Sequence, residues 1–153
     1  MQHLWIDTDM GFDDLAAVLL VAAQPSWQID GLSLVAGNAP LPVVIDNALR
    51  SAACFGWRMP IHAGCDQPLA CDLVTAQNIL GLDAMASAGR SLPLVRSALA
   101  SADAVRRFAE THAAEIVLIG RSAPYRAASG GAFGQFWRHW RRSGAGFWTS
   151  WCA

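Results

Sequence analysis

A cluster of four carboxylates near the N-terminus is the feature of this 153-residue chain that most clearly indicates chemistry. Asp7, Asp9, Asp13 and Asp14 lie within eight residues, in the order Asp-Thr-Asp-Met-Gly-Phe-Asp-Asp. Like charges at this spacing repel one another unless a positive group neutralises them, and a hard cation with oxygen ligands is the simplest such group. We expect Gly11 to let the backbone turn sharply, so that Asp9 and Asp14 approach one ion from opposite sides of the loop.

The same residues also allow a simpler interpretation, in which the carboxylates cap a helix and are solvated without a metal. That interpretation is the better one for any single Asp, whereas four together at the end of a strand favour a cation site. An EF-hand loop is excluded, because its third ligand position would be Gly11 and its twelfth position Val18 instead of Glu.

Strand and helix patterns alternate along the chain, which predicts parallel βαβ units with right-handed crossovers. The apolar periodicity predicts strands at residues 3–8, 29–36, 59–63 and 115–119, helices at 13–23, 43–55 and 102–112, a turn at 9–12 and a long loop region at 64–101. We therefore expect an α/β fold with an open, mostly parallel Rossmann-like sheet and flanking helices. The acidic cluster then lies at the carboxyl end of the first strand, where such sheets bind ligands.

Composition favours a soluble α/β core and argues against a membrane protein. Hydrophobic residues make up 54% of the chain and charged residues 15%. The longest apolar run, residues 15–23, is about half of the roughly 18 residues that a membrane span needs. Asp7 and Asp9 stand where a signal peptide would carry positive charge. We expect a cytoplasmic protein without a membrane or nucleic-acid partner.

The cysteines lack the C-x-x-C spacing that is typical of zinc sites, and cytosolic proteins keep such thiols reduced. We therefore expect reduced, buried and inert side chains at these positions. They are Cys54, Cys65, Cys71 and Cys152.

The character of the chain changes at Gly120. Residues 1–120 carry 6 Arg against 12 Asp and Glu, whereas residues 121–153 carry 5 Arg, no acidic residue and four of the seven tryptophans. The chain has no Lys. We interpret 1–120 as a domain and 121–153 as a basic, Trp-rich tail, in which the aromatic spacing at 133–140 allows a short amphipathic helix. The tail has the composition expected of GC-rich DNA read in the wrong frame, and binding of nucleic acid or an anionic membrane is the weaker alternative.

Several motifs, in the same order, resemble the inosine–uridine nucleoside hydrolase family. LWIDTDMGFDDLAAVLL, residues 4–20, is similar to that family's opening signature, D-x-D-x-G-x-D-D after a hydrophobic strand. The similarity continues through LSLVAGNAP, DNALRSAACFGWRMPIHAGCDQPL, ILGLDAMASAGRSLP and DAVRRFAETHAAEIVLIG. The resemblance covers residues 3–120 and implies the N-terminal half of a nucleoside hydrolase.

This resemblance implies calcium-dependent hydrolysis of the N-glycosidic bond of ribonucleosides, which releases base and ribose. Asp9 would be both a Ca²⁺ ligand and the general base, and Asp14 would be the second carboxylate ligand. Asp7 would belong to the metal site as a support from behind, and Asp13 and Asn38 would hydrogen-bond the ribose hydroxyls. Calcium would lower the pKa of its water, and the anionic pocket would favour an oxocarbenium-like transition state.

Two departures from the family pattern bear on activity. Many members carry a His before the ILG-like segment, where this chain has Ala76-Gln77-Asn78, and Gln77 or Asn78 is either a substrate contact or plain loop surface. After EIVLIG the family continues with Gly-Pro-Leu-Thr-Asn and later supplies further ligands, whereas this chain has Gly-Arg-Ser-Ala-Pro at 120–124. We expect hydrolysis to be impaired or absent in a truncated site of this kind.

Two functional interpretations therefore stay open, and measurable turnover separates them. One is a nucleoside hydrolase-like enzyme, and the other is a non-catalytic fragment that binds calcium and ribose. A phosphohydrolase of the haloacid dehalogenase type is rejected, because Gly11 stands where that class needs Thr or Val and the chain has no Lys. A sheet without its second half would leave an edge and apolar faces uncovered, so we also expect self-association into a homo-oligomer.

Overall fold

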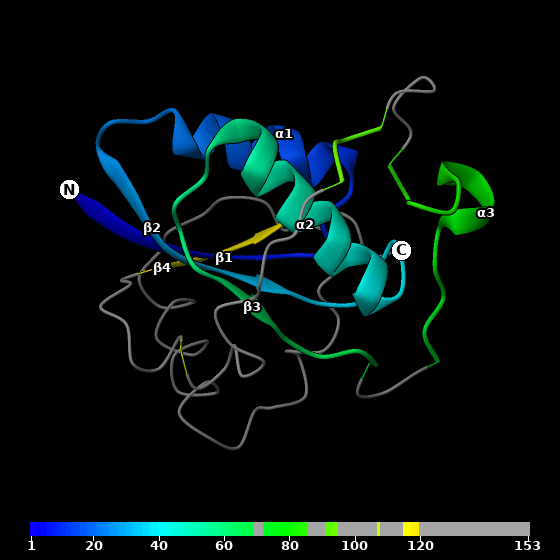
Figure 1. Ribbon diagram of the computed structural model, residues 1–153. Helices are drawn as coiled ribbons and strands as arrows, with labels where there is room; N and C mark the ends of the chain where they lie inside the picture. The colour runs from blue at the N-terminus through cyan, green and yellow to red at the C-terminus, as the bar shows by residue number, and fades with distance from the viewer. Residues whose placement is uncertain (69–71, 86–90, 95–106, 108–114, 120–153) are drawn as a thin grey trace, which may run out of the picture.

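A parallel sheet of four strands carries the acidic cluster (Figure 1). The computed structural model describes residues 1–68, 72–85, 91–94, 107 and 115–119. The strands are β1 (Gln2–Thr8), β2 (Trp27–Leu34), β3 (Ile61–Ala63) and β4 (Glu115–Ile119), and the helices are α1 (Phe12–Ala22), α2 (Leu41–Phe55) and α3 (Gln77–Leu80). All neighbouring strands are parallel, in the order β3-β2-β1-β4. The predicted open, parallel α/β sheet is confirmed.

The predicted elements agree with the observed ones to within two residues at the described ends, but the short helix α3 lies in the region at 64–101 that was predicted as a loop. Strand β2 differs by two residues at both ends, and it ends at Leu34 instead of residue 36. The Val35 N–H still donates to the Thr8 carbonyl at 3.1 Å, while the Ala36 N–H turns to the Cys65 carbonyl at 3.0 Å. Helix α2 ends where predicted, because Gly56 adopts the left-handed conformation with φ 66° and its N–H closes the last turn on Ala52.

Helices α1 and α2 lie on the same face of the sheet (Figure 1) and enclose the apolar core with it. The chain runs β1-α1-β2-α2-β3 outward in one direction, and right-handed crossovers in one direction place both helices on one side. Alternate strand residues such as Ile6, Leu32 and Leu34 meet Val18 of α1 and Val44 of α2, all fully buried. This packing fixes the start of α1 against the end of β1.

The opposite face of the sheet holds polar and aromatic side chains that are equally buried. Trp5, Ser33 and His62 come from β1, β2 and β3 and are each exposed by 4% or less. The Trp5 ring stacks on His62 with centroids 5.4 Å apart, and its indole N–H donates to the Ser33 hydroxyl at 3.0 Å. Burial lowers the pKa of His62, with the charge of Arg107 adding to the effect, so its ring is neutral at pH 7.

The strand order reverses beside β1, which lies between β2 and β4. From β1 the chain continues to β2 and β3 on one side, whereas β4 lies on the other side of β1. The carboxyl ends of the strands at such a reversal form the usual ligand-binding point of an open α/β sheet. The acidic cluster follows β1 directly. The fold therefore places it at the switch point.

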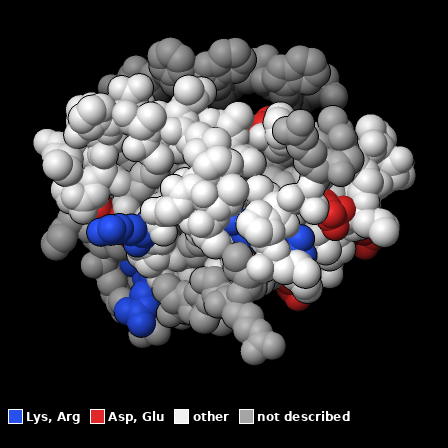
Figure 2. Space-filling view, turned by 45° about the horizontal axis from the view of Figure 1, so that its top comes forward, with Lys and Arg blue, Asp and Glu red and all other residues white. Residues whose placement is uncertain are grey.

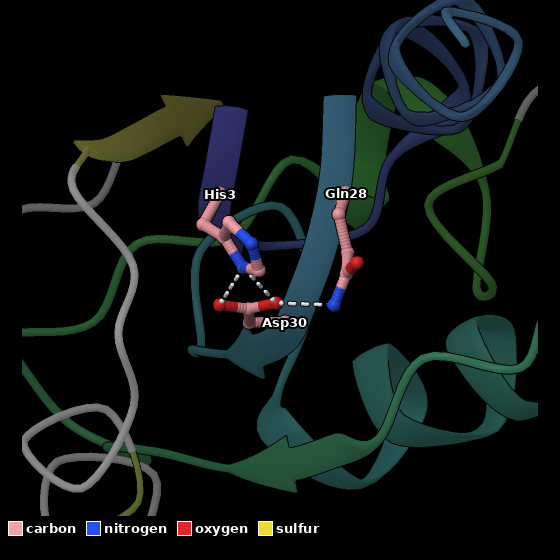
Figure 3. A network of polar contacts seen from close by, with 3 residues as sticks. All are labelled: His3, Gln28 and Asp30. Carbon is pink, nitrogen blue, oxygen red and sulfur yellow. Dashed lines mark hydrogen bonds and ion pairs between the residues drawn. The ribbon is translucent and has the colours of Figure 1, made fainter. Parts of the chain in front are cut away.

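The amino ends of β1 and β2 are joined by a separate polar network, shown in Figure 3. The ladder shifts register between Leu4 and Trp5, which pair with Ile29 and Gly31, so Asp30 is the extra residue of a bulge. Its carboxylate lies 3.0 Å from Nδ1 of His3 and accepts a hydrogen bond from Gln28 Nε2 at 3.1 Å. These contacts hold the register at the end of the sheet opposite the acidic cluster.

Several predictions concern residues outside the described part of the chain. They are the remainder of the helix at 102–112, of which only Arg107 is described and is helical, the tail at 121–153 with its amphipathic segment, and Cys71 and Cys152. Among the described residues, none of the helices has the length and apolarity that a bilayer span requires.

The prediction of buried cysteines is wrong for the two that are described, because Cys54 is exposed and Cys65 is partly exposed. Cys54 lies near the C-terminal end of α2, on the side away from the core. Burial, with the nearby charges of Asp7 and Asp66, nevertheless raises the pKa of the Cys65 thiol, which favours its unreactive protonated form.

The surface is mostly uncharged on the face seen in Figure 2, where the described acidic and basic side chains are few and scattered. Large apolar side chains are exposed as well, among them Leu20, Ile79 and Leu82 at 70%, 81% and 82%. Apolar exposure of this kind is the physical basis for the predicted self-association, which stays a prediction.

Replacement of Gly31 tests how tightly the buried polar face is packed. A Cβ on Gly31 would overlap the six-membered ring of Trp5. We expect Gly31→Ala to lower the free energy of unfolding by about 1–3 kcal/mol, measured by urea denaturation. The cost of Gly31→Ala should shrink in a Trp5→Phe background, since the smaller ring leaves room; equal costs in both backgrounds would contradict this packing.

Candidate active site at the carboxyl ends of β1 and β2

The loop from β1 to α1 turns at Met10, and not at Gly11 as predicted. Met10 has φ 46° in the left-handed region, whereas Gly11 has φ −77° and ψ −176°, which any residue adopts. Gly11 is needed for space instead: a Cβ there would lie 2.6 Å from Nδ2 of Asn38 and 3.0 Å from carboxylate oxygens of Asp13 and Asp14. The missing side chain therefore lets the three polar groups converge.

Asp14 is fully buried in the first turn of α1. Its Oδ2 accepts the Gly11 N–H at 2.7 Å, which caps the helix and places a carboxylate at the positive end of the helix dipole. Its Oδ1 is buried and has no hydrogen-bond partner. One oxygen of Asp14 is thus anchored and the other is unsatisfied.

Asp9 shows the same division between its two oxygens. Oδ2 accepts the Asn38 N–H at 2.7 Å, while Oδ1 is buried without a hydrogen-bond partner. Gly37 makes this arrangement sterically possible, because a Cβ on Gly37 would overlap the Asp9 side chain. The Asp14 side chain also interacts with Asp9, so the two carboxyl groups lie beside each other.

Asp7 lies behind this pair, within the buried polar face of the sheet. The Ser33 hydroxyl donates to its Oδ1, and Ser33 in turn accepts from the Trp5 indole. Its Oδ2 is a third buried carboxylate oxygen without a hydrogen-bond partner, and the residue is only 2% exposed.

Burial raises the pKa of all three carboxyl groups. The pKa of Asp7 and that of Asp14 rise to about 7, in each case chiefly because of burial, with the charge of Asp9 adding to the rise. Burial also raises the pKa of Asp9, although the hydrogen bond from the Asn38 N–H opposes the rise. Without a cation the site is therefore partly protonated near neutral pH.

Asp13 and Asn38 form the more accessible edge of the site. Asp13 is exposed in the first turn of α1 and Asn38 is partly buried after β2, whereas Asp9 and Asp14 are at most 1% exposed. The arrangement is a buried acidic floor with polar side chains nearer the solvent, which suits a neutral ligand rich in hydroxyl groups.

Sequence reasoning did not identify two buried polar residues that support the site, Ser33 and Asn47. Ser33 holds Asp7, and Asn47 donates from α2 to the carbonyls of Asp83 and Met10. Each stands among apolar neighbours in a pattern that predicts a core position, and a polar residue on such a face was the available signal.

Gln77 and Asn78 were predicted as either substrate contacts or plain loop surface, and both lie in the short helix α3. Gln77 donates to the Leu82 carbonyl at 2.6 Å and so closes its own turn, while Asn78 is exposed. The segment is anchored at the site by the Ala76 N–H, which donates to the Asn38 carbonyl at 2.9 Å.

The donor set fits a hard cation in part. Three buried carboxylate oxygens have no hydrogen-bond partner, and oxygen ligands are those that Ca²⁺ prefers. The ion pairs His3–Asp30 and Arg50–Asp46 lie elsewhere. Within the described ranges, however, no three Asp, Glu, His or Cys residues group closely enough to hold a metal by themselves. Asp9 and Asp14 are the pair that would bind such an ion.

Solved structures of nucleoside hydrolases share this fold. The plant nucleoside hydrolase PpNRh1 superposes with a TM-score of 0.67 at 24% identity, over 83% of this chain and 42% of the plant protein. An inosine-guanosine nucleoside hydrolase gives a TM-score of 0.61 at 22% identity, over 77% of this chain and 38% of its own.

Curated relatives match in sequence over half of this chain. The pyrimidine-specific ribonucleoside hydrolase RihB of Escherichia coli (strain SE11) is 33% identical over 76 residues, or 50% of this chain and 24% of the relative. The uncharacterized protein C1683.06c of Schizosaccharomyces pombe is 38% identical over 77 residues, or 50% and 25%. The matching part of the chain thus spans about a quarter of the length of these relatives.

A family profile extends the match over most of the chain. Residues 4–123 fit the family described as inosine-uridine preferring nucleoside hydrolase. This range includes the acidic loop, Asn38 and all four strands of the sheet apart from the first residues of β1. The chain belongs to the inosine-uridine preferring nucleoside hydrolase family.

Proposed function

We propose that this chain forms the calcium- and ribose-binding part of a site that hydrolyses the N-glycosidic bond of ribonucleosides. The observation that carries the proposal is the set of buried carboxylate oxygens without hydrogen-bond partners, on Asp7, Asp9 and Asp14, at the sheet's switch point. Burying such groups without compensation is costly, and a bound cation with its water ligands offsets that cost.

Asp9 and Asp14 are the proposed calcium ligands. Each has one oxygen fixed by a backbone N–H at 2.7 Å, so the orientation of its second oxygen is restricted before any ion binds. Bound calcium would supply Lewis acidity, which lowers the pKa of a coordinated water, and a fixed point for the ribose diol. Asp7 supports the pair from the sheet, where the Ser33 hydroxyl holds its carboxyl group.

Asp9 is also the proposed general base. A carboxylate whose pKa is raised by burial accepts a proton more readily near neutral pH than an exposed Asp does. The Asn38 N–H holds Oδ2, which leaves Oδ1 to take the proton of the attacking water. As the nucleobase leaves the ribose, positive charge develops on the sugar, and the neighbouring acidic groups stabilise it.

Asp13 and Asn38 are the proposed ligands of the ribose hydroxyls, because their side chains lie beside the calcium ligands but nearer the solvent. The similar proteins are named for different nucleosides, pyrimidine ribonucleosides in one and inosine and guanosine in another. The part of the site described here therefore concerns ribose, and the proposed substrate class is ribonucleosides in general.

A second candidate function is binding of calcium and ribose without catalysis. It is favoured by the observation that two carboxylates converge in the described part of the chain and no third His, Cys, Asp or Glu joins them as a metal-holding group. A site with few protein ligands would hold its ion weakly and position water poorly.

Calcium titration by calorimetry tests the proposed ligands. We expect wild-type protein to bind one calcium ion and Asp14→Asn to weaken binding at least about 10-fold, since it removes a ligand charge at constant size. Asp46→Asn is the matched control, because Asp46 is exposed on α2 and pairs with Arg50 away from the site. Equal losses in both variants would mean that net charge, and not a site, attracts the ion.

The raised pKa values predict how stability depends on pH. The folded pKa of Asp7 and Asp14, about 7, exceeds the ordinary value of 3.8, so the folded protein binds more protons than the unfolded chain between these values. In EDTA, the free energy of unfolding should therefore fall as pH rises from about 4 to 7, on the order of a few kcal/mol. Calcium should reverse the trend, because it binds the ionised carboxylates.

Urea denaturation across this pH range measures the effect, and Asp14→Asn provides the comparison. The variant lacks one of the shifted groups, so its stability in EDTA should fall less steeply with pH than that of the wild type. A wild-type protein whose stability in EDTA rises between pH 4 and 7 would show that these carboxyl groups are not buried as described.

A hydrolysis assay separates the two candidate functions. We expect any release of ribose from inosine or uridine by the calcium-loaded protein to be slow, and Asp9→Asn to lower its kcat at least about 100-fold, since it removes the general base. Ser33→Ala leaves the calcium pair in place and should cost less. Calcium binding without any ribose release from the wild-type protein would favour the non-catalytic function, and absence of both would reject the proposed function.

A further inference from the structure

Asn47 is a buried polar residue that the proposed chemistry does not use. It lies on the core face of α2 between the apolar Val44 and Ala48, and its side chain is 5% exposed. Its Nδ2 donates to the Asp83 carbonyl at 2.8 Å and, over a longer 3.4 Å, to the Met10 carbonyl. An amide group is seldom kept in such a place unless its hydrogen bonds are needed.

The Met10 carbonyl belongs to the peptide group between Met10 and Gly11. The carbonyl of this peptide accepts from Asn47, and its N–H donates to Oδ2 of Asp14 at 2.7 Å. A peptide group is planar and rigid, so a donor that fixes the carbonyl also fixes the direction of the N–H. Asn47 thus acts on Asp14 through a single peptide plane, without touching it.

Contacts from other residues must stabilise this peptide group, because the backbone conformation of Met10 is unfavourable. Met10 has φ 46°, in the left-handed region that is unfavourable for a residue other than Gly. The Met10 side chain is fully buried in the core, and the backbone N–H of Met10 donates to the Thr8 hydroxyl at 3.0 Å. These contacts, with that from Asn47, keep the turn in place.

The other acceptor of Asn47, the Asp83 carbonyl, also lies next to a residue with positive φ. The Asp83 carbonyl belongs to the peptide group between Asp83 and Ala84. Ala84 has φ 49°, and in the described part of the chain it is the one non-glycine residue apart from Met10 with positive φ. Ala84 is 1% exposed, and its N–H donates to the Gly81 carbonyl at 2.9 Å. The segment that contains it begins at the Ala76 N–H, which binds the Asn38 carbonyl.

We propose that Asn47 is a positioning residue, whose single amide group aims the Asp14 carboxylate and ties the segment at 76–84 to the site. The inference rests on the proposed function for its effect on calcium, whereas the orientation of the Met10–Gly11 peptide can be tested without calcium. An amide is required here, because both partners are carbonyls and two hydrogens on one nitrogen can serve both. Leucine of similar size offers no hydrogen, and aspartate would face the carbonyls with negative charge.

The experiment compares Asn47→Leu with a control on the same helix. Ser51 lies one turn further along α2, is fully buried and has a hydroxyl without a hydrogen-bond partner, so Ser51→Ala removes a buried polar group that holds no loop. Asn47→Ser is the second variant, because its short hydroxyl keeps a donor but cannot reach both carbonyls, and it serves if the leucine variant does not fold.

Two readouts are used at a temperature at which every variant is folded. In EDTA, the amide resonance of Gly11 in ¹⁵N-labelled protein reports its hydrogen bond to the Asp14 carboxylate. We expect this resonance to move upfield in both Asn47 variants and to stay in place in Ser51→Ala, since only the former release the peptide plane. Titration calorimetry should show calcium binding weakened about 10-fold or more in the Asn47 variants and within about twofold of wild type in Ser51→Ala.

An unchanged Gly11 resonance in a folded Asn47 variant would overturn the proposal, whatever the loss of stability, because Asn47 would then be a structural residue only. A displaced resonance with calcium affinity unchanged would also overturn it, since Asp14 would bind without the aid of the plane. If the wild-type protein binds no calcium, the proposed function fails, and the Gly11 resonance alone still decides whether Asn47 orients the peptide.

Discussion

The burial of three carboxyl groups at the end of one strand is the constraint on which the rest of the site depends. Asp7, Asp9 and Asp14 are each at most 2% exposed, and each keeps one oxygen without a hydrogen-bond partner. Removing such groups from water is among the most expensive steps in folding. The neighbouring structure reduces that cost with backbone N–H donors and with glycines at 11 and 37, whose missing side chains leave the space that the carboxylates occupy.

The two faces of the sheet support this arrangement in different ways. Ile6, Leu32 and Leu34 pack against α1 and α2 and supply the apolar burial that holds the fold together. The other face carries the polar contacts from Trp5 through Ser33 to Asp7, so the support of the acidic floor is separate from the core. Because side chains alternate along a strand, the seven residues of β1 contribute to both faces.

Much of the fold and the position of the site could be predicted from local pattern, whereas the details that depend on packing could not. Residue periodicity and the Asp-x-Asp-x-Gly-x-Asp-Asp spacing place the cluster after a parallel strand, and parallel strands end at one edge. The turn at Met10, the extra residue Asp30 in β2 and the reach of Asn47 depend on contacts between distant segments. The spacing of residues along the chain does not encode those contacts. A glycine at position 11 could serve either a sharp backbone turn or the need for space, and only the side chains around it show that space is the reason.

On the proposed function, the placement of the polar groups would let one acidic loop serve ribonucleosides that carry different bases. The buried pair and the two more exposed groups, Asp13 and Asn38, lie within one short loop and one strand end. A ribose ring presents the same hydroxyls whichever base it carries, so this part of a site has no reason to change with the base. Contacts that distinguish purines from pyrimidines can then vary in other segments without disturbing the carboxylates, whose geometry is fixed by backbone donors and by α2.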